Sequence, residues 1–220
     1  MCGRYTLVQA EQVAERFQAA EAQLPLLPRY NVAPSQLMPV VVRNSPNRLV
    51  EMQWGLVPAW SKEPRTSFST INARAETIAT SAVFRGPFKS RRCLVPASGF
   101  YEWQKLEKGK QPFCIRLRGG DLFAFAGLYD IWRDREGNEL YSYTIITTAP
   151  NELVAPIHNR MPAILRREDE DAWLSKDSDA ARLMGMLEAY PADAMEAYPV
   201  SRAVNSPAHD GAELMQPAAA

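Results

Sequence analysis

The middle third of the chain is a series of short apolar runs rich in β-branched and aromatic residues. These runs occupy residues 93–103, 111–117, 122–132 and 141–149. Glycine occurs in every segment between them, as is common in hairpin connections, at 107–110, 118–121 and 133–139. The pattern predicts four consecutive antiparallel strands, and we expect them to form the centre of a sheet.

Periodicity and turn residues assign the rest of the chain. Helices are expected at 9–20, 73–82, 168–174 and 179–189. Strands are expected at 38–43 and 49–57, and irregular connections at the proline-broken 24–36 and the polar 61–69. In the first helix Val13, Phe17 and Ala20 share one face, as in an amphipathic helix. Asp177 or Ser178 would cap the last helix.

Together these elements predict an α+β fold in a single domain that spans residues 1–220. A sheet of many short strands must curl or be covered at its edges. We therefore expect a curled, mostly antiparallel, barrel-like β core flanked by short helices. Residues 208–220 or thereabouts are small and polar, and we expect the end of this tail to fray.

Composition narrows the classes of protein that this chain can be. Its formal net charge is zero, so a polyanion would be bound by a local basic patch and not by the field of the whole molecule. Three cysteines do not make a disulfide framework, which fits a reducing compartment. No apolar run approaches the roughly 20 residues of a membrane span, and the amino terminus lacks a signal-peptide pattern. We expect a soluble cytoplasmic protein that does not bind membranes and, without coiled-coil heptads, a monomer.

The sequence offers no ligand set for a metal or a cofactor. It contains two histidines, His158 and His209, and no Cys/His spacing resembles a zinc site. It has neither a phosphate-binding glycine loop nor a Gly-x-Ser-x-Gly elbow. We therefore expect no metal and no cofactor, and we assign no chemistry to His209 in the polar tail.

Chemistry is suggested first by Cys2, which directly follows the initiator methionine. If Met1 is removed, Cys2 carries an α-amine and a thiol on adjacent carbons. An aldehyde condenses with such an amine to a Schiff base, and the thiol then closes a five-membered thiazolidine ring. The amine titrates near pH ~8 and the thiol near ~8.5, so both are expected to be partly nucleophilic at neutral pH. The alternative is a small second residue that merely permits methionine removal.

Asn72 and Arg74 lie where a loop is expected to enter a helix. The amide of Asn72 offers a donor and an acceptor, and the guanidinium of Arg74 offers a planar fork for a phosphate. The alternative is that Asn72 caps the helix and that Arg74 is a solvated surface charge.

Glu102 lies between large aromatic residues in an expected strand. Strand alternation places Glu102 on the face of Phe100, with Tyr101 and Trp103 on the other face. Removal of the carboxyl from water would raise its pKa toward neutrality, which suits a general acid/base. The alternative is a carboxylate on the wet face of the strand, paired with a cross-strand lysine.

His158 follows the last expected strand, in a loop with proline at both ends. Loops on rigid scaffolds often hold functional side chains, and histidine titrates near neutral pH, so His158 can transfer a proton. Arg160, two residues later, could bind a phosphate beside it. The alternative is a loop histidine whose hydrogen bonds are satisfied within the protein.

Seven segments of the chain together resemble one protein family, the SOS response-associated peptidase (SRAP) family, from Met1 to about Gln216. They are MCGRY, RYNVAPSQ, WGLVPAW, INARAET, CLVPASGFYEW, IHNRMP and VSRAVNSP, in the family's order. The family contains bacterial abasic-site processing proteins and eukaryotic relatives. The resemblance implies an enzyme of the DNA damage response that is associated with the bacterial nucleoid.

The family's chemistry is a covalent DNA–protein crosslink. An abasic site in single-stranded DNA exposes an aldehyde, and the mature amino-terminal cysteine closes a thiazolidine on it, which shields the lesion. Carried over by matching position, Cys2 is the nucleophile and Asn72 holds the amino terminus and the sugar. Glu102 would orient and deprotonate the α-amine, and His158 would act as acid/base on sugar-ring opening and later steps.

The resemblance also implies the residues that bind the DNA. Phosphates on either side of the lesion would be held by Arg4, Arg74 and Arg160. Stacking or wedging against bases would fall to Asn31, Pro34 and Trp60. The chain departs from the family at Ser61, where some relatives have a second tryptophan, so Trp60 or Phe68 would take over the wedge.

Other functions remain open for the same residues. Cys2 could be the nucleophile of a peptidase that removes Met1 from its own chain. The arginines and aromatics alone could form a non-covalent reader of damaged or modified DNA. A Schiff base at Cys2 could also support a lyase, because β-elimination needs only a base near C2′ of the sugar.

Overall fold

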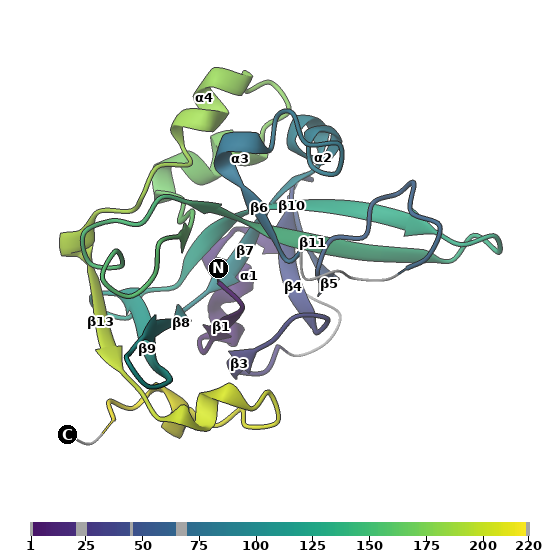
Figure 1. Ribbon diagram of the computed structural model, residues 1–220. Coiled ribbons are helices and arrows are strands. Elements are labelled where there is room, and N and C mark those ends of the chain that lie inside the picture. The colour runs from purple at the N-terminus through teal and green to yellow at the C-terminus, as the bar shows by residue number, and fades with distance from the viewer. Residues whose placement is uncertain (1, 21–25, 45, 65–69, 219–220) are drawn as a thin grey trace.

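The computed structural model describes residues 2–20, 26–44, 46–64 and 70–218 of the chain (Figure 1). Our expectations for Met1, for Phe68 and for the rest of segment 65–69 fall outside these residues.

Five strands close into a barrel at the centre of the molecule. Around the barrel they follow the order β11 (Glu139–Thr148), β10 (Phe123–Arg133), β7 (Arg92–Ala97), β4 (Leu37–Val42) and β5 (Asn47–Trp54). Neighbours are antiparallel except at the closure, where β5 runs parallel to β11 with Gln53 opposite Ser142. Three short strands pair with ends of the barrel strands: β6 (Asn72–Arg74) and β12 (Met161–Pro162) with β11, and β2 (Ala19–Ala20) with β5.

A second, five-stranded sheet packs beside the barrel and contains the amino-terminal strand. Its order is β13 (Met195–Pro199), β9 (Lys110–Leu117), β8 (Gly99–Lys105), β1 (Arg4–Leu7) and β3 (Arg29–Val32), with every pair antiparallel. Tyr5 of β1 meets the rings of Trp54 and Phe125 edge-on at centroid distances of 5.2 and 5.9 Å. Its hydroxyl lies 2.7 Å from that of Tyr143. These contacts fix the amino-terminal strand against the barrel.

The helices are short and lie outside the sheets. They are α1 (Val13–Arg16), α2 (Arg85–Ser90), α3 (Glu170–Leu174) and α4 (Ala180–Gly185). Single 3-10 turns occur at η1 (Ala10–Gln12), η3 (Ala75–Thr77), η4 (Arg167–Asp169), η5 (Ala192–Ala194), η6 (Arg202–Asn205) and η7 (Ala212–Met215). Figure 1 shows α2, α3 and α4 together at the top. No helix in the described residues is long and apolar enough to cross a membrane. The α+β class with a barrel-like core and short helices is confirmed.

The apolar run at 93–103 forms two strands in different sheets. Ser98 separates β7 from β8, and its N–H donates to the carbonyl of Thr6 at 2.8 Å. As a result β9 pairs with β8 and β13, whereas β10 pairs with β7 and β11. The glycine-bearing connection at 118–121 therefore crosses between the sheets, and the expectation of four consecutively paired strands is wrong.

Three expected helices are shorter than their patterns suggested, and in 179–189 the helix is α4, which ends at Gly185. In 9–20 the helix ends at Arg16, because Gln18 adopts a positive φ of 48° and the chain then joins β2. The segment 73–82 begins within β6, which pairs with β11, and continues as the single turn η3.

The cap of α4 also lies later than expected. The side chain of Asp179 accepts the backbone N–H of Arg182, so Asp179 caps the helix in place of Asp177 or Ser178.

The C-terminal segment (residues 201–218) packs against the second sheet, whereas we expected a polar tail with a frayed end. Asp210 accepts the backbone N–H groups of Tyr30 and Asn31 at 2.6 and 2.7 Å, and its carboxylate pairs with Arg29. Leu214 is wholly buried. The polar residues of this segment thus bind β3 through hydrogen bonds and an ion pair.

Replacing Asp210 by alanine is expected to lower the free energy of unfolding by about 2–3 kcal/mol. The change leaves two backbone N–H groups and a guanidinium without their acceptor. Urea unfolding of Asp210→Ala and of the parent measures the difference. Asp177→Ala removes an exposed carboxylate and is expected to stay within about 0.5 kcal/mol of the parent. Equal losses of stability in the two variants would contradict a stabilising role for the contacts of Asp210 with β3.

Candidate functional site

The site is built on the antiparallel pairing of β1 with β8. The register sets Arg4 opposite Tyr101, and its continuation by one residue places Gly3 opposite Glu102. Cys2 therefore lies close to Glu102, and the charge of this carboxylate acts on the Cys2 thiol. Two residues that are about 100 positions apart in the sequence are brought together by the sheet.

Burial keeps the thiol of Cys2 protonated. The side chain is wholly buried, and its Sγ donates to the carbonyl of Arg4 at 3.6 Å. Burial raises the pKa of the thiol well above its ordinary value, and the negative charge of Glu102 raises this pKa further. In the folded chain with Met1 present, burial therefore acts against the partly ionised thiol that we expected for the chain without Met1. The thiol must therefore lose its proton as it reacts.

Glu102 lies on the inner face of the second sheet. Phe100 packs in the barrel core, whereas Tyr101 and Trp103 pack under the C-terminal segment, so the expected alternation is confirmed. Glu102 is only 2% exposed, which excludes the wet-face alternative. Burial raises the pKa of Glu102 to about 7, and the positive charge at the amino terminus opposes this shift. A carboxyl with this pKa can both accept and donate a proton near neutral pH.

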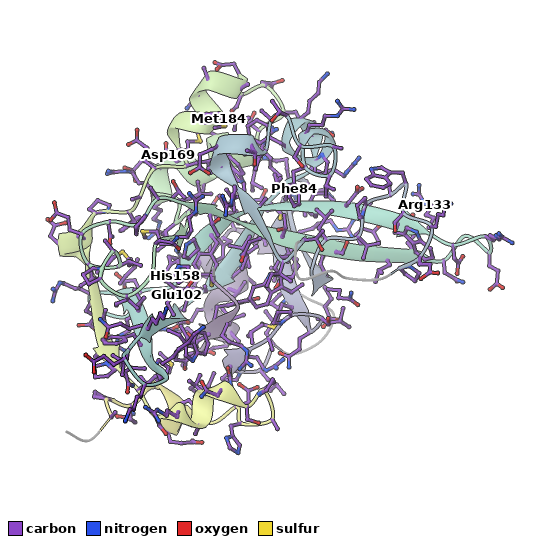
Figure 2. The ribbon with its side chains drawn as sticks, in the orientation of Figure 1. Phe84, Glu102, Arg133, His158, Asp169 and Met184 are labelled. Carbon is purple, nitrogen blue, oxygen red and sulfur yellow. The ribbon has the colours of Figure 1, made fainter. Side chains whose placement is uncertain are left out.

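His158 faces Glu102, as Figure 2 shows. Its Nδ1 lies 3.9 Å from Oε1 of Glu102, and the backbone of Arg160 hydrogen-bonds to the same nitrogen at 3.1 Å. Burial lowers the pKa of His158, and the positive charge at the amino terminus acts in the same direction. Both effects favour the neutral form of the imidazole, next to a carboxyl whose pKa burial raises to about 7.

The loop that carries His158 is held from two sides. Arg160 binds both carboxylate oxygens of Glu76, at 2.5 and 2.9 Å, and donates to the carbonyl of Thr147 at 2.6 Å. This guanidinium lowers the pKa of Glu76 through its hydrogen bonds. Gln104 of β8 donates to the carbonyl of Pro156 at 3.1 Å. The loop is thereby fixed to both the barrel edge and the second sheet.

Asn72 lies in β6 and does not cap a helix. Its side chain is 6% exposed, and Nδ2 donates to the carbonyl of Ile145 at 3.4 Å. Its Oδ1 is buried and has no hydrogen-bond partner among the described residues. Arg74, two residues on, is exposed, and Pro34 is half-buried in the turn before β4.

Besides Arg160, two more of the expected DNA-binding residues make their hydrogen bonds inside the protein. Arg4 donates to Oδ1 of Asn31 at 2.9 Å and to the carbonyls of Val204 and Asn205 at 2.8 and 3.1 Å. Asn31 is wholly buried, and its Nδ2 donates to three carbonyls of the C-terminal segment. In this structure both side chains hold that segment, and Asn31 presents no surface for stacking.

Trp60 is the exposed aromatic of the predicted set, with 68% of its surface accessible. Its turn is held on both sides. The N–H of Ala59 donates to Oδ2 of Asp130 at 3.0 Å, and Nε1 of Trp132 donates to the carbonyl of Ser61 at 2.8 Å. Both anchors come from β10, so the barrel presents the indole of Trp60 to solvent in a defined position.

Sequence reasoning missed Asp130 and Lys110. Asp130 is 3% exposed, and a lone carboxylate inside the apolar run 122–132 was a usable signal. Lys110 lies in a lysine-rich turn without any such signal, yet its positive charge lowers the pKa of both Glu102 and His158. Within the described part of the chain, no group of three His, Cys, Asp or Glu side chains is placed to hold a metal.

Comparisons with known proteins extend over nearly the whole chain. A family model described as SOS response associated peptidase (SRAP) matches residues 1–207. Abasic site processing protein YoqW of Bacillus subtilis (strain 168) is 48% identical over 223 residues, 98% of this chain and 99% of that protein. Abasic site processing protein HMCES of Gallus gallus is 37% identical and covers 86% of this chain and 66% of that protein. A crystal structure of a protein from Bacteroides thetaiotaomicron has 29% identity and a TM-score of 0.90, and covers 99% of this chain and 100% of that chain.

Glu102 is expected to titrate near pH 7 in the folded protein, which carboxyl ¹³C NMR measures directly. Its folded pKa lies above the ordinary 4.5, so the folded chain keeps a proton that the unfolded chain releases. The contribution of Glu102 to stability is therefore full below pH 4.5 and declines, by up to about 3 kcal/mol, as the pH rises through 7. Glu102→Gln should remove this decline, and an identical pH dependence in the parent and the variant would contradict the assignment.

Proposed function

The chain belongs to the SRAP family, and from this membership and the Cys2 site we propose that it captures abasic sites in single-stranded DNA as covalent thiazolidine crosslinks. The observation that carries the proposal is the buried Cys2 next to the buried Glu102 of the neighbouring strand, with Nδ1 of His158 3.9 Å from Oε1 of Glu102. The names of two relatives, abasic site processing proteins YoqW and HMCES, support it.

The first step is attack of the α-amine of the mature chain, which begins at Cys2, on the C1′ aldehyde of the open sugar. The amine is nucleophilic only without its proton, and the Glu102 carboxylate is placed to accept it. The carbinolamine then loses water to form a Schiff base. Glu102 and His158, 3.9 Å apart, form the pair that returns a proton to the departing oxygen.

The second step is ring closure by the thiol. Cys2 holds a protonated thiol in this buried position, so the sulfur adds to the imine carbon while its proton passes to the nearby carboxylate or the ring nitrogen. One aldehyde and one cysteine thus give one thiazolidine and one water. Asn72, with a buried Oδ1 unbonded among the described residues, would hold the amino terminus and the sugar.

The DNA strand would contact those expected DNA-binding residues that are at least partly open to solvent. Arg74 is a solvent-facing guanidinium, Trp60 an exposed ring and Pro34 a half-buried turn residue, and they would bind a phosphate and flanking bases. Arg160 and Arg4 keep bonds within the protein, so we assign to them the positioning of the histidine loop and of the C-terminal segment.

Changing Cys2 to alanine is expected to abolish the crosslink. Parent, Cys2→Ala and Cys114→Ala are incubated with an abasic oligonucleotide and run on a denaturing gel. The Cys114→Ala control removes another buried thiol and should keep the shifted band. A chain with one extra residue ahead of Cys2 should lose the band, because it lacks the amine beside the thiol.

A shifted band that persists in Cys2→Ala would contradict the proposal. A non-covalent reader would instead show no band in any chain, with undamaged-strand affinity equal in the parent and Cys2→Ala.

Changing Glu102 to glutamine is expected to slow crosslinking at pH 7 by about 10²-fold, the usual size of a general base contribution. Quenched time courses between pH 6 and 8 measure the rate. The parent rate should rise through pH 7 as Glu102 ionises, whereas the variant should lack this rise. Glu107→Gln, an exposed carboxylate on the same hairpin, is the control and should match the parent. Equal rates in all three chains would remove Glu102 from the mechanism.

Intact mass of the same samples addresses self-removal of Met1, the second candidate activity. It is favoured by the description of the matching family as a peptidase and by the Glu102–His158 pair beside the amino terminus. Met1 retained in Glu102→Gln but lost from the parent would support self-cleavage. Met1 lost from both chains would assign its removal to an aminopeptidase. In that case a slow crosslinking rate of Glu102→Gln would reflect the lost carboxylate and not a retained Met1.

A further inference from the structure

A cavity of about 450 Å³ opens on the outer face of the second sheet and is lined by Trp103, Lys110, Arg202 and Asn205. Trp103 directly follows Glu102 in β8, so the two side chains point to opposite faces of the same strand. The cavity and the buried carboxylate are therefore separated by the thickness of one sheet. Figure 1 shows β8 and β9 next to the C-terminal segment that supplies the other wall.

The aromatic wall of this cavity is held in place. Nε1 of Trp103 donates to Oδ1 of Asn205 at 2.7 Å, and the carbonyl of Asn205 accepts a hydrogen bond from Arg4 at 3.1 Å. Arg4 also binds the carbonyl of Val204, so the turn η6 is bonded to β1. The Trp103 side chain remains half-buried, with part of its surface open to the cavity.

The other two walls are positive. Lys110 and Arg202 are exposed, and neither makes an ion pair within the described residues. The charge of Lys110 lowers the pKa of Glu102 and of His158, so this side chain lies within electrostatic range of the site. Two cations and an indole side by side are the groups that bind single-stranded nucleic acid, because cations pair with phosphates and bases stack on the ring.

We propose that this cavity binds the nucleotides on one side of the abasic site, with a base on Trp103 and phosphates at Lys110 and Arg202. The inference rests on the proposed function and adds a subsite to it. The net charge of the chain is zero, so the strand needs such a local patch beside the reactive cysteine. Arg4 positions this subsite through Asn205 and does not bind the strand itself.

The first experiment uses an undamaged single-stranded oligonucleotide and needs no covalent step. Binding by fluorescence anisotropy is measured against salt for the parent and for Lys110→Gln/Arg202→Gln. Each phosphate contact on a single strand contributes about 0.7 to the slope of log K against log salt, so the slope should fall by about 1.4. Trp103→Leu should lower affinity about 5- to 100-fold with the slope unchanged.

The control is Lys176→Gln/Arg182→Gln, which removes two exposed cations near α3 and α4 and should keep the parental slope. Equal slopes in the two double variants would overturn the subsite. Inorganic phosphate at the ionic strength of the salt series is the competing ligand. If phosphate displaces the strand from the parent no better than chloride does, the site recognises the strand. Stronger displacement by phosphate from the parent than from the double variant would assign the site to free phosphate and overturn the subsite.

The second experiment uses abasic oligonucleotides extended by several nucleotides on only one side of the lesion. In the parent, extension on the side of the cavity should speed crosslinking, and the double variant should lose this gain for that side alone. An equal gain on both sides in both chains would overturn the proposal. If the parent and Lys110→Gln/Arg202→Gln differ in salt slope with undamaged DNA but the parent never crosslinks, the proposed function is wrong and the subsite stands. If the parent crosslinks but the two chains have equal salt slopes, the proposed function stands and the subsite is wrong.

Discussion

Burial of the Glu102 carboxyl next to Cys2 is the constraint on which the site depends. A carboxylate taken out of water must be neutralised, paired or protonated, and here burial raises its pKa to about 7. That environment exists because β1 runs between β3 and β8 and is covered by the barrel through Tyr5. The same burial raises the pKa of the Cys2 thiol and lowers the pKa of the His158 imidazole, so it favours the uncharged form of all three groups.

Segments from distant parts of the chain converge on this strand pair. The histidine loop is tied to the barrel edge by Arg160 and to β8 by Gln104. The C-terminal segment is tied to β1 by Arg4 and to β3 by Asp210. The two attachments lie on either side of the sheet, so the inner face holds Glu102 and His158 while the outer face forms a basic, aromatic cavity.

The sequence predicted the parts that depend on local pattern. The β-branched runs gave most strands of the core, and alternation placed Glu102 on the inner face and Trp103 on the outer face, as the structure has them. The break at Ser98 was not predictable, because it depends on a hydrogen bond to the far end of the chain at Thr6. The positions of Arg4, Asn31 and Asp210 were missed for the same reason, since polar residues look alike until their partners are known. The ionisation of Cys2 likewise depends on tertiary burial.

The central position of β1 in its sheet affects how the protein is made. The strand leaves the ribosome first, but its partner β8 is translated about 100 residues later, which takes about 5–20 s at common elongation rates. Until then the amino-terminal cysteine has no sheet to cover it. Glu102 is itself a residue of β8, so this carboxyl lies beside Cys2 only once β8 is in place.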